Sequence, residues 1–140
     1  MPSLDRSTAW ALLHTARVAR LATIGPRGPH QVPVVFAIDG PDLVTAVDGK
    51  PKSGQVLARI RHLDADPRVS LLADHYEEDW SRLWWVRVEG TAAVEHEGEG
   101  FQRGIETLRH RYRQYQEVAV PGPLIRIAPL VVQGWRASAG

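Results

Sequence analysis

The order of the secondary-structure elements is the feature that most limits the fold of this chain. Segments with a strand pattern outnumber helical segments about two to one, and short turns join most of them. The order is helix, three strands, helix, two strands, helix, strand. A doubly wound parallel sheet requires regular alternation of strands and helices, and no Gly-x-Gly-x-x-Gly occurs. The sequence therefore predicts a mainly β fold, a small antiparallel barrel with peripheral helices packed outside it.

Hydrophobic periodicity and turn residues give the boundaries of these elements. We expect an N-terminal helix over about 4–15, capped by Ser3 or Asp5. Pro33 indicates a strand edge or a bulge, and Gly90 indicates a bulge. The first three strands are predicted to form an antiparallel meander, in which the second, apolar on both faces, is covered on both. The predicted strands are 18–24, 30–38, 43–47, 68–74, 83–95 and 124–135 (interrupted by Pro129), and the later helices are 55 to about 66 and 98–116.

Length and composition exclude several classes of protein. With 140 residues the chain is expected to form one domain, 1–140, that buries about two-thirds of its unfolded surface. A net charge of +1 argues against a nucleic-acid binder, and the lack of cysteine excludes disulfides, thiolate metal sites and a cysteine nucleophile. Residues 1–6 lack a signal-peptide pattern, and no apolar run approaches the 18 or so residues that span a bilayer. We expect a soluble, cytoplasmic protein.

Two lysines stand together in the segment 48–54, whereas all fifteen other cationic residues are arginine. Lys50, Lys52 and Ser53 directly precede the predicted helix that starts at about residue 55. Free backbone N–H groups and the positive end of the helix dipole favour an anion there, and lysine binds phosphate as a point charge. The segment is therefore either a phosphate-binding loop or an ordinary solvated turn.

Adjacent tryptophans in the fifth strand must point to opposite faces of the sheet. Trp84 and Trp85 cannot both enter one core, so one of them meets solvent, a partner subunit or a flat ligand. Arg87 shares a face with Trp85, which places a planar ring beside a guanidinium, as a flat heteroaromatic cofactor requires. A subunit interface is the alternative, because it too is enriched in tryptophan and arginine. We favour an interface role for Trp84 and a combined interface and cofactor role for Trp85.

Other polar residues give weaker indications of chemistry. The acidic segment 74–79 has no second histidine at ligand spacing, so we predict no metal site. No serine lies in a Gly-x-Ser-x-Gly turn, which argues against a hydrolase triad. His30 opens the second strand and could reach a ligand at the barrel mouth. The arginines of the last helix are expected on a solvated outer face, with an acidic ligand tail or a second subunit as the alternative; they are Arg103, Arg109, Arg111 and Arg113.

Taken together, several segments resemble the pyridoxamine-phosphate-oxidase-like split-barrel superfamily. The resemblance extends from about residue 17 to 136 and is closest to the class assigned to the deazaflavin coenzyme F420. Residues 79–85 and 135–136 look like one subgroup of that class. The order and spacing of the segments carry the resemblance; they are Ala19-Arg20-Leu21-Ala22-Thr23, His30-Gln31-Val32-Pro33-Val34, Val47-Asp48-Gly49-Lys50-Pro51-Lys52, Asp66-Pro67-Arg68-Val69-Ser70-Leu71 and Val86-Arg87-Val88-Glu89-Gly90.

The resemblance implies a six-stranded antiparallel split β-barrel that forms a homodimer, with two equivalent flavin or deazaflavin sites in grooves at the interface. It places the second strand beside the cofactor ring and the end of the third strand next to it. The loop that follows would bind the phosphate, and the fifth strand would supply a tryptophan and an arginine. The cofactor-binding residues implied in this way are Val32, Pro33, Val34, Val47, Asp48, Lys50, Lys52, Ser53, Trp85 and Arg87.

Two departures argue against vitamin B6 oxidase activity. The family's B6 oxidases carry Arg-x-Val-Leu-Leu-Lys on the second strand, where this chain has no cation, and their C-terminal vitamin-binding motif is not recognisable. The expected function is F420-dependent hydride transfer between the reduced cofactor and a small organic acceptor. The alternatives are an FMN-dependent oxidoreductase, a non-catalytic flavin or deazaflavin carrier, and a haem-binding protein with His30 or His75 as axial ligand. No catalytic residue is identified; solvent, Tyr76 or His30 could supply the proton.

Overall fold

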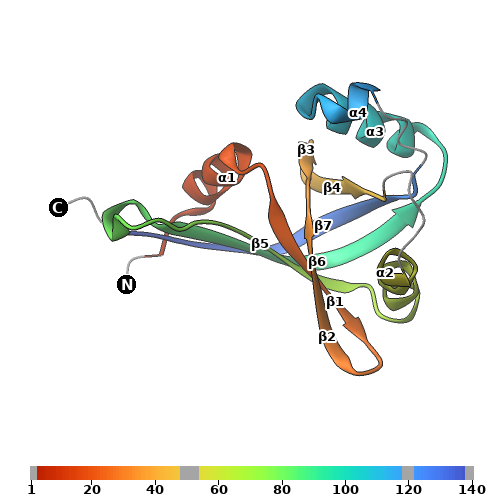
Figure 1. The fold of residues 1–140 in the computed structure, drawn as a ribbon, viewed down its shortest axis with the longest axis horizontal. Coiled ribbons are helices and arrows are strands. Elements are labelled where there is room, and N and C mark those ends of the chain that lie inside the picture. The colour runs from red at the N-terminus through yellow and green to blue at the C-terminus, as the bar shows by residue number, and fades with distance from the viewer. Residues whose placement is uncertain (1–2, 48–53, 118–121, 138–140) are drawn as a thin grey trace.

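The computed structural model describes residues 3–47, 54–117 and 122–137, and it confirms a mainly β fold with an antiparallel sheet and few helices (Figure 1). The N-terminal helix begins after Asp5, whose carboxylate accepts from Thr8 N at 2.7 Å, so Asp5 is the cap. The elements are α1 (Arg6–Thr15), β1 (Ala19–Gly25), β2 (Gly28–Val34), β3 (Ala37–Asp39), β4 (Asp42–Ala46), α2 (Gly54–Ala65), β5 (Arg68–His75), η1 (Trp80–Arg82), β6 (Trp84–Glu95), α3 (Glu99–Arg111), α4 (Gln114–Glu117) and β7 (Leu124–Arg136).

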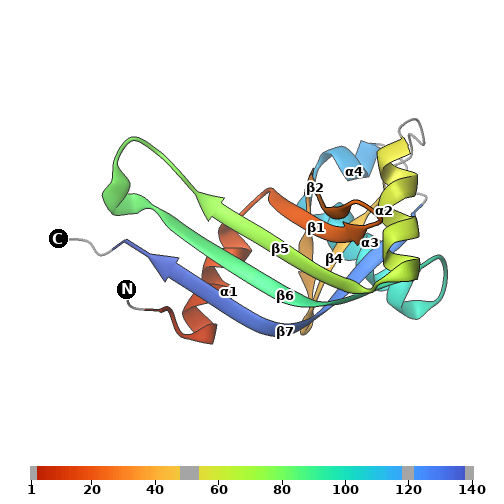
Figure 2. The ribbon, with the colours of Figure 1, turned by 90° about the horizontal axis from the view of Figure 1, so that it is seen from below.

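The sheet has the strand order β2-β1-β5-β6-β7-β4-β3, so its two edge strands, β2 and β3, are consecutive in the chain. Only Val35 and Phe36 separate Val34 from Ala37. Three Cα–Cα steps of about 3.8 Å bridge at most about 11 Å, so the two edges must lie close together. The sheet therefore curls into a barrel that is split between β2 and β3, with β5, β6 and β7 extending beyond it as a long ribbon (Figure 2).

The predicted second strand, 30–38, is wrong as a single strand, because the chain turns a corner at Phe36. The Tyr112 hydroxyl accepts a hydrogen bond from Phe36 N at 3.1 Å and donates to Phe36 O at 2.6 Å, and Thr45 Oγ1 donates to Val35 O. Side chains therefore satisfy backbone groups that a continuous strand would pair in the sheet. The sheet has seven strands for this reason, where the sequence indicated six.

The predicted antiparallel pairings of the first three strands are present, but they do not form one continuous meander, because the second strand is divided. β1 pairs with β2 in one hairpin, whereas β3 pairs with β4 in another at the far edge of the sheet. Burial alternates along β2, with Val32 and Val34 buried but Gln31 and Pro33 exposed, so only one face is covered. Pro33 lies on an edge strand, as predicted, where its missing N–H breaks no pairing with a further strand.

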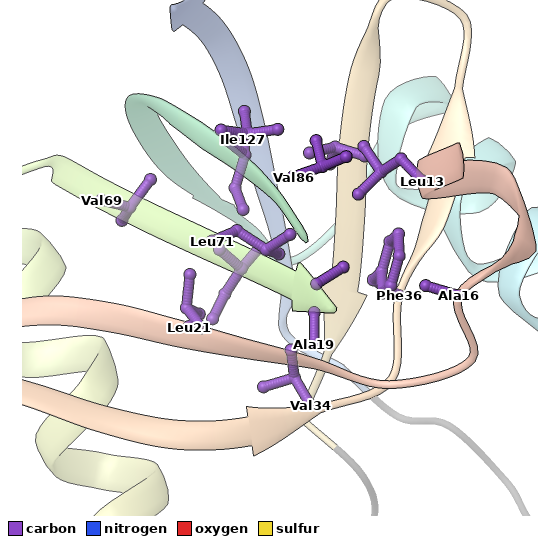
Figure 3. Close-up of a cluster of buried hydrophobic side chains, with 14 of the residues drawn as sticks. Leu13, Ala16, Ala19, Leu21, Val34, Phe36, Val69, Leu71, Val86 and Ile127 are labelled. Atoms are coloured by element: carbon purple, nitrogen blue, oxygen red, sulfur yellow. The ribbon is translucent and has the colours of Figure 1, made fainter. Parts of the chain in front are cut away.

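The barrel interior is filled by aliphatic side chains from β1, β2, β5, β6 and β7, among them Leu21, Leu71 and Val86 (Figure 3). Helix α1 closes the ribbon side of this core with the fully buried Leu13. A second cluster packs α3 against β4 and the start of β7; it contains Ala37, Val44, Ala46, Ile105, Leu108, Tyr112 and Leu124. Apolar burial, the main stabilising contribution, therefore fixes the helices on separate parts of the sheet.

The sheet has a bulge where β6 passes β7, and this confirms the prediction for Gly90. Glu89 lies opposite Val131 and Gly90 opposite Pro129, so Leu130 is the extra residue, on β7. A Cβ on Gly90 would lie 2.1 Å from Ala128 O, so only glycine fits. Strand β7 extends on both sides of Pro129, and the predicted interruption takes the form of this bulge at the next residue, Leu130, which points into solvent with 69% of its surface exposed.

The last predicted helix is two helices. α3 ends at Arg111 and the short α4 follows it. The expectation of a wholly solvated arginine face is wrong, because Arg111 Nη2 donates to the His14 and Ala16 carbonyls at the end of α1. Arg103 pairs with Asp39 on β3. Among the described residues, no helix combines the length and the apolar character needed to cross a membrane.

Candidate functional site

The most developed candidate site lies where β6 and β7 leave the barrel. Trp85 pairs in register with Trp135, and Arg87 with Gln133. All four belong to the sheet face opposite the buried Val86, because side chains alternate along a strand. They line a cavity of about 480 Å³ together with Ser3, Leu4, Val132 and Gly134. A volume of this size is typical of small-molecule sites, about 300–1,000 Å³.

Arg87 is held in one orientation by its neighbours. Its guanidinium carbon lies 5.1 Å from the centre of the Trp85 ring, and Nη2 donates to Gln133 Oε1 at 2.7 Å. Its Nε lies 3.2 Å from Glu89 Oε1. The prediction that Trp85 and Arg87 lie side by side is confirmed. The arrangement offers a flat apolar face next to a directed N–H donor, which is what a planar ring with acceptor atoms needs.

Trp84 and Trp85 point to opposite faces, as predicted. Trp84 shares the face of Val86 and packs against the barrel core, where it is partly buried. Trp85 is also partly buried, beside the cavity. The interface role of either tryptophan stays a prediction, since the structure contains one copy of the chain.

Of the residues expected beside the cofactor ring, Val32, Pro33 and Val34 lie level with Arg87, three strands away across β1 and β5. Val32 and Val34 point into the core and are 7% exposed, so a ligand there would contact their backbone, whereas Pro33 points outward. Val47 is buried, and its N donates to Pro123 O at 2.9 Å. Asp48, Lys50, Lys52 and Ser53 lie outside the described residues.

One copy of the chain does not bring Val47, the last described residue before the lysine segment, to the Trp85 cavity. Val47 follows Ala46, which pairs with Leu124, and Leu124 pairs with Glu95 at the end of β6. Trp85 stands ten residues before Glu95 on the same strand. At about 3.3 Å per residue, roughly 30 Å of strand separates them. Figure 2 shows the same separation, with the start of β6 at the tip of the ribbon and α2 at the opposite end.

Sequence analysis missed Gln133 and the N-terminal segment as parts of the cavity. Leu4 N donates to Gly134 O at 3.0 Å, and Ser3 forms a bridge with Trp135, so the segment before α1 adds itself to the free edge of β7. The sequence does contain one indication of the role of Gln133. It stands two residues before Trp135 on the same strand, so the two side chains share a face.

A second, apolar hollow of about 320 Å³ lies on the same outer face at the level of the bulge. Ile24, Leu130 and Val131 line it and expose 36%, 69% and 43% of their surface. Ser70, Glu89 and Gly90 complete the floor between them. Because three large aliphatic side chains are exposed together here, the face has the character of a contact surface.

His30 does not face open solvent as a free ligand would. Its ring meets His62 edge to face, with centroids 5.2 Å apart, and His62 Nδ1 lies 2.9 Å from Thr23 Oγ1. Burial, and then the positive charge of His30 and Arg61, lowers the pKa of His62 below its ordinary value. The pair therefore joins α2 to the β1–β2 hairpin.

The loop between β5 and β6 forms a rigid acidic tip. Asp79 caps η1 by accepting from Ser81 N and Oγ, and these bonds lower the pKa of Asp79. His75 hydrogen-bonds to Glu77, which also pairs with Arg82. Within residues 3–47, 54–117 and 122–137, no three histidine, aspartate or glutamate side chains form a group that could hold a metal ion.

The strand order and the corner at Phe36 define a split antiparallel β-barrel. The family model for pyridoxamine 5'-phosphate oxidase matches residues 8–136. The chain therefore belongs to the pyridoxamine 5'-phosphate oxidase family. No curated protein sequence matches the chain.

Several solved structures share the fold. A FAD-binding protein from Mesorhizobium loti has a TM-score of 0.72 at 22% identity over 95% of each chain. A conserved hypothetical protein from Mycobacterium tuberculosis has a TM-score of 0.76 at 23% identity, over 96% of this chain and 86% of the other. The haem storage protein HutZ from Vibrio cholerae has a TM-score of 0.69 at 14% identity, over 91% and 92%. Identities at this level support the fold only.

Proposed function

We propose that this protein is an F420-dependent oxidoreductase that transfers a hydride between the reduced deazaflavin and a small organic acceptor. The observation that carries the proposal is the Arg87 guanidinium, held by Gln133 against the Trp85 ring beside a cavity of about 480 Å³. Membership of a family named for a flavin enzyme, and the fold shared with a FAD-binding protein, support a cofactor of the flavin type. The choice of F420 within that type comes from the sequence resemblance.

A bound deazaflavin would supply the two-electron hydride chemistry. In this site Trp85 and Trp135 offer flat apolar surface and exclude water, while Arg87 donates to acceptor atoms at the edge of a ring. Gln133 fixes the direction of that donor. Tyr76 is exposed on the tip and remains a candidate proton donor, whereas His30 packs on His62 and is a weaker one.

We further propose that the working unit is a homodimer with two equivalent cofactor sites at its interface. Roughly 30 Å of strand separates Trp85 from the strand end at Glu95, beside which Val47 lies. This separation supports a site in which one copy contributes the Trp85 cavity and the other contributes the segment that follows Val47. Lys50 and Lys52 would neutralise the phosphate of the cofactor held with the partner's tryptophan.

Titration of the purified protein with F420, FMN and haem, followed by absorbance and fluorescence, tests this function. Saturable binding of F420 with weaker binding of FMN supports the proposal. Preferential binding of FMN would instead indicate an FMN-dependent oxidoreductase. A haem spectrum that is lost in His30→Ala or His75→Ala would replace it with a haem-binding role. Turnover of reduced cofactor with an acceptor panel then distinguishes an enzyme from a carrier.

A further inference from the structure

The tip between β5 and β6 presents two large aromatic side chains to solvent. Tyr76 is 72% exposed and Trp80 is 68% exposed. The tip is internally braced, because Asp79 accepts from Ser81 and Leu83 N donates to Trp80 O. Aromatic side chains held rigidly in water are typical of contact surfaces, where tyrosine and tryptophan contribute most of the binding energy.

The tip continues directly from the candidate site. Trp84 pairs with His75 and Trp85 with Asp74, so the loop 76–83 begins where the Trp85 cavity ends. If Trp85 contacts a second copy of the chain, Tyr76 and Trp80 therefore lie close to the same part of that copy.

The apolar hollow around Gly90 stands midway along this face. Gly90 lies five positions after Trp85 and five positions before Glu95 on β6. In an isologous dimer the same patch meets itself across a two-fold axis. An axis that crosses the strands at the exposed Leu130 and Val131 exchanges the two ends of β6, which brings the tip of one copy to the Glu95 end of β6 in the other, beside which Val47 lies.

We propose that Tyr76 and Trp80 act in trans, as the wall of the acceptor site in a second copy of this chain. The inference rests on the proposed function, which identifies the site as an acceptor site. It adds that Tyr76 and Trp80 determine which acceptors bind there. Two aromatic faces favour a flat acceptor by stacking. Glu77, Glu78 and Asp79 outnumber Arg82 on the same loop, so an uncharged or cationic acceptor is favoured over an anionic one.

Site-directed photo-cross-linking tests the placement without any cofactor. Because the chain has no cysteine, Trp80→Cys provides a single attachment point for a benzophenone maleimide. Irradiation of a mixture of ¹⁵N-labelled and unlabelled protein should give a covalent dimer whose mixed-isotope peptides map to the end of β6 or the start of β7. Glu106→Cys, exposed on α3, is the control and should give no such dimer. Adducts confined to one chain, or mapped to other elements, overturn the inference.

Acceptor selectivity tests the role of the aromatic ring. Trp80→Ala should lower kcat/KM for flat acceptors about threefold to tenfold, with little change for a small non-planar acceptor and in cofactor Kd. Trp80→Phe should restore most of the loss. Equal losses for both acceptor types overturn the selectivity role. If the cross-link maps as expected but neither F420 nor FMN binds, the proposed function fails and the trans placement stands; if a cofactor binds without the cross-link, the reverse holds.

Discussion

The hydroxyl of Tyr112 contacts both backbone polar groups of Phe36, at 3.1 Å from its N and 2.6 Å from its O. Phe36 is fully buried at the corner that joins the two edges of the sheet. Tyr112, the residue that follows α3, thus takes the place of a neighbouring strand, and the barrel closes without hydrogen bonds between β2 and β3.

Tyr112→Phe should reduce the free energy of unfolding by about 1–3 kcal/mol, because it leaves a buried N–H and a buried C=O without a partner. Urea unfolding followed by tryptophan fluorescence measures the change. Tyr76→Phe removes the same atom from an exposed side chain and should change stability by no more than about 0.5 kcal/mol. Similar effects of the two substitutions would contradict this role of Tyr112.

Arg126 joins three elements by its contacts with carboxylates. Its Nη1 donates to Asp39 and Asp42, and its Nε to Glu95, with only 12% of the side chain exposed. Desolvation opposes the charged form, but these bonds outweigh it and raise the pKa of Arg126. Arg126→Met should cost about 1–3 kcal/mol, because the partly buried carboxylates of Asp39, Asp42 and Glu95 lose a charged hydrogen-bond donor.

Arg103→Met is the matched control for that prediction. It removes an arginine that contacts the same Asp39 but has 59% of its side chain exposed. An exposed ion pair contributes about 1 kcal/mol or less. Thermal or urea unfolding that shows equal losses in the two variants would argue against Arg126 as the centre of the cluster.

Arg87→Met should weaken cofactor binding by at least about tenfold, since it removes a charge-assisted donor beside the Trp85 ring. Equilibrium titration measures Kd. Arg20→Met is the control on the same outer face, since Arg20 is half exposed and pairs with Asp74. Unchanged affinity in a folded Arg87→Met protein would remove Arg87 from the site.

Mixed dimers test whether two chains build each site. Lys50→Ala with Lys52→Ala should weaken cofactor binding at least about tenfold, as should Trp85→Ala with Arg87→Met. A dimer of one copy of each variant has one intact site, so tight binding should return to about half of the sites in heterodimers, or about a quarter of all sites in an equal mixture with random pairing. No recovery in a mixture shown to contain heterodimers would mean that each site forms within one chain.

Stability should depend on pH through His62. The pKa of His62 is lowered in the folded state, so the unfolded chain binds more protons in the interval just below the ordinary value of 6.5. Stability therefore rises with pH through that interval and falls as pH drops below about 6.5. His62→Gln should flatten the dependence of Tm between pH 7.5 and 5.5, whereas the exposed His110→Gln should leave it unchanged.

Local patterns were sufficient for most of the fold. Asp5 as a cap, the Gly90 bulge and the pairing of Trp85 with Arg87 all depend on residues close in sequence. The division of the second strand was not predictable in this way, because it depends on Tyr112, which lies 76 residues beyond Phe36.

The bulge also explains why Gln133 escaped sequence analysis. Ile125 and Ile127 point into the core, and strict alternation would turn Gln133 and Trp135 inward as well. The extra residue Leu130 inverts that alternation, so both join the outer face with Trp85. The face of a strand beyond a bulge depends on its partner strand, which the sequence of β7 alone does not specify.

The position of β7 has a consequence for synthesis on the ribosome. β7 lies between β6 and β4, and it is the last strand in the described part of the chain. Until residues 124–136 have left the ribosome, the β3–β4 hairpin has no strand to join, and β6 exposes an unpaired edge (Figure 1). Barrel closure must therefore follow translation of residues 124–136, and a truncated nascent chain ending before Leu124 is the species most exposed to aggregation and to capture by chaperones.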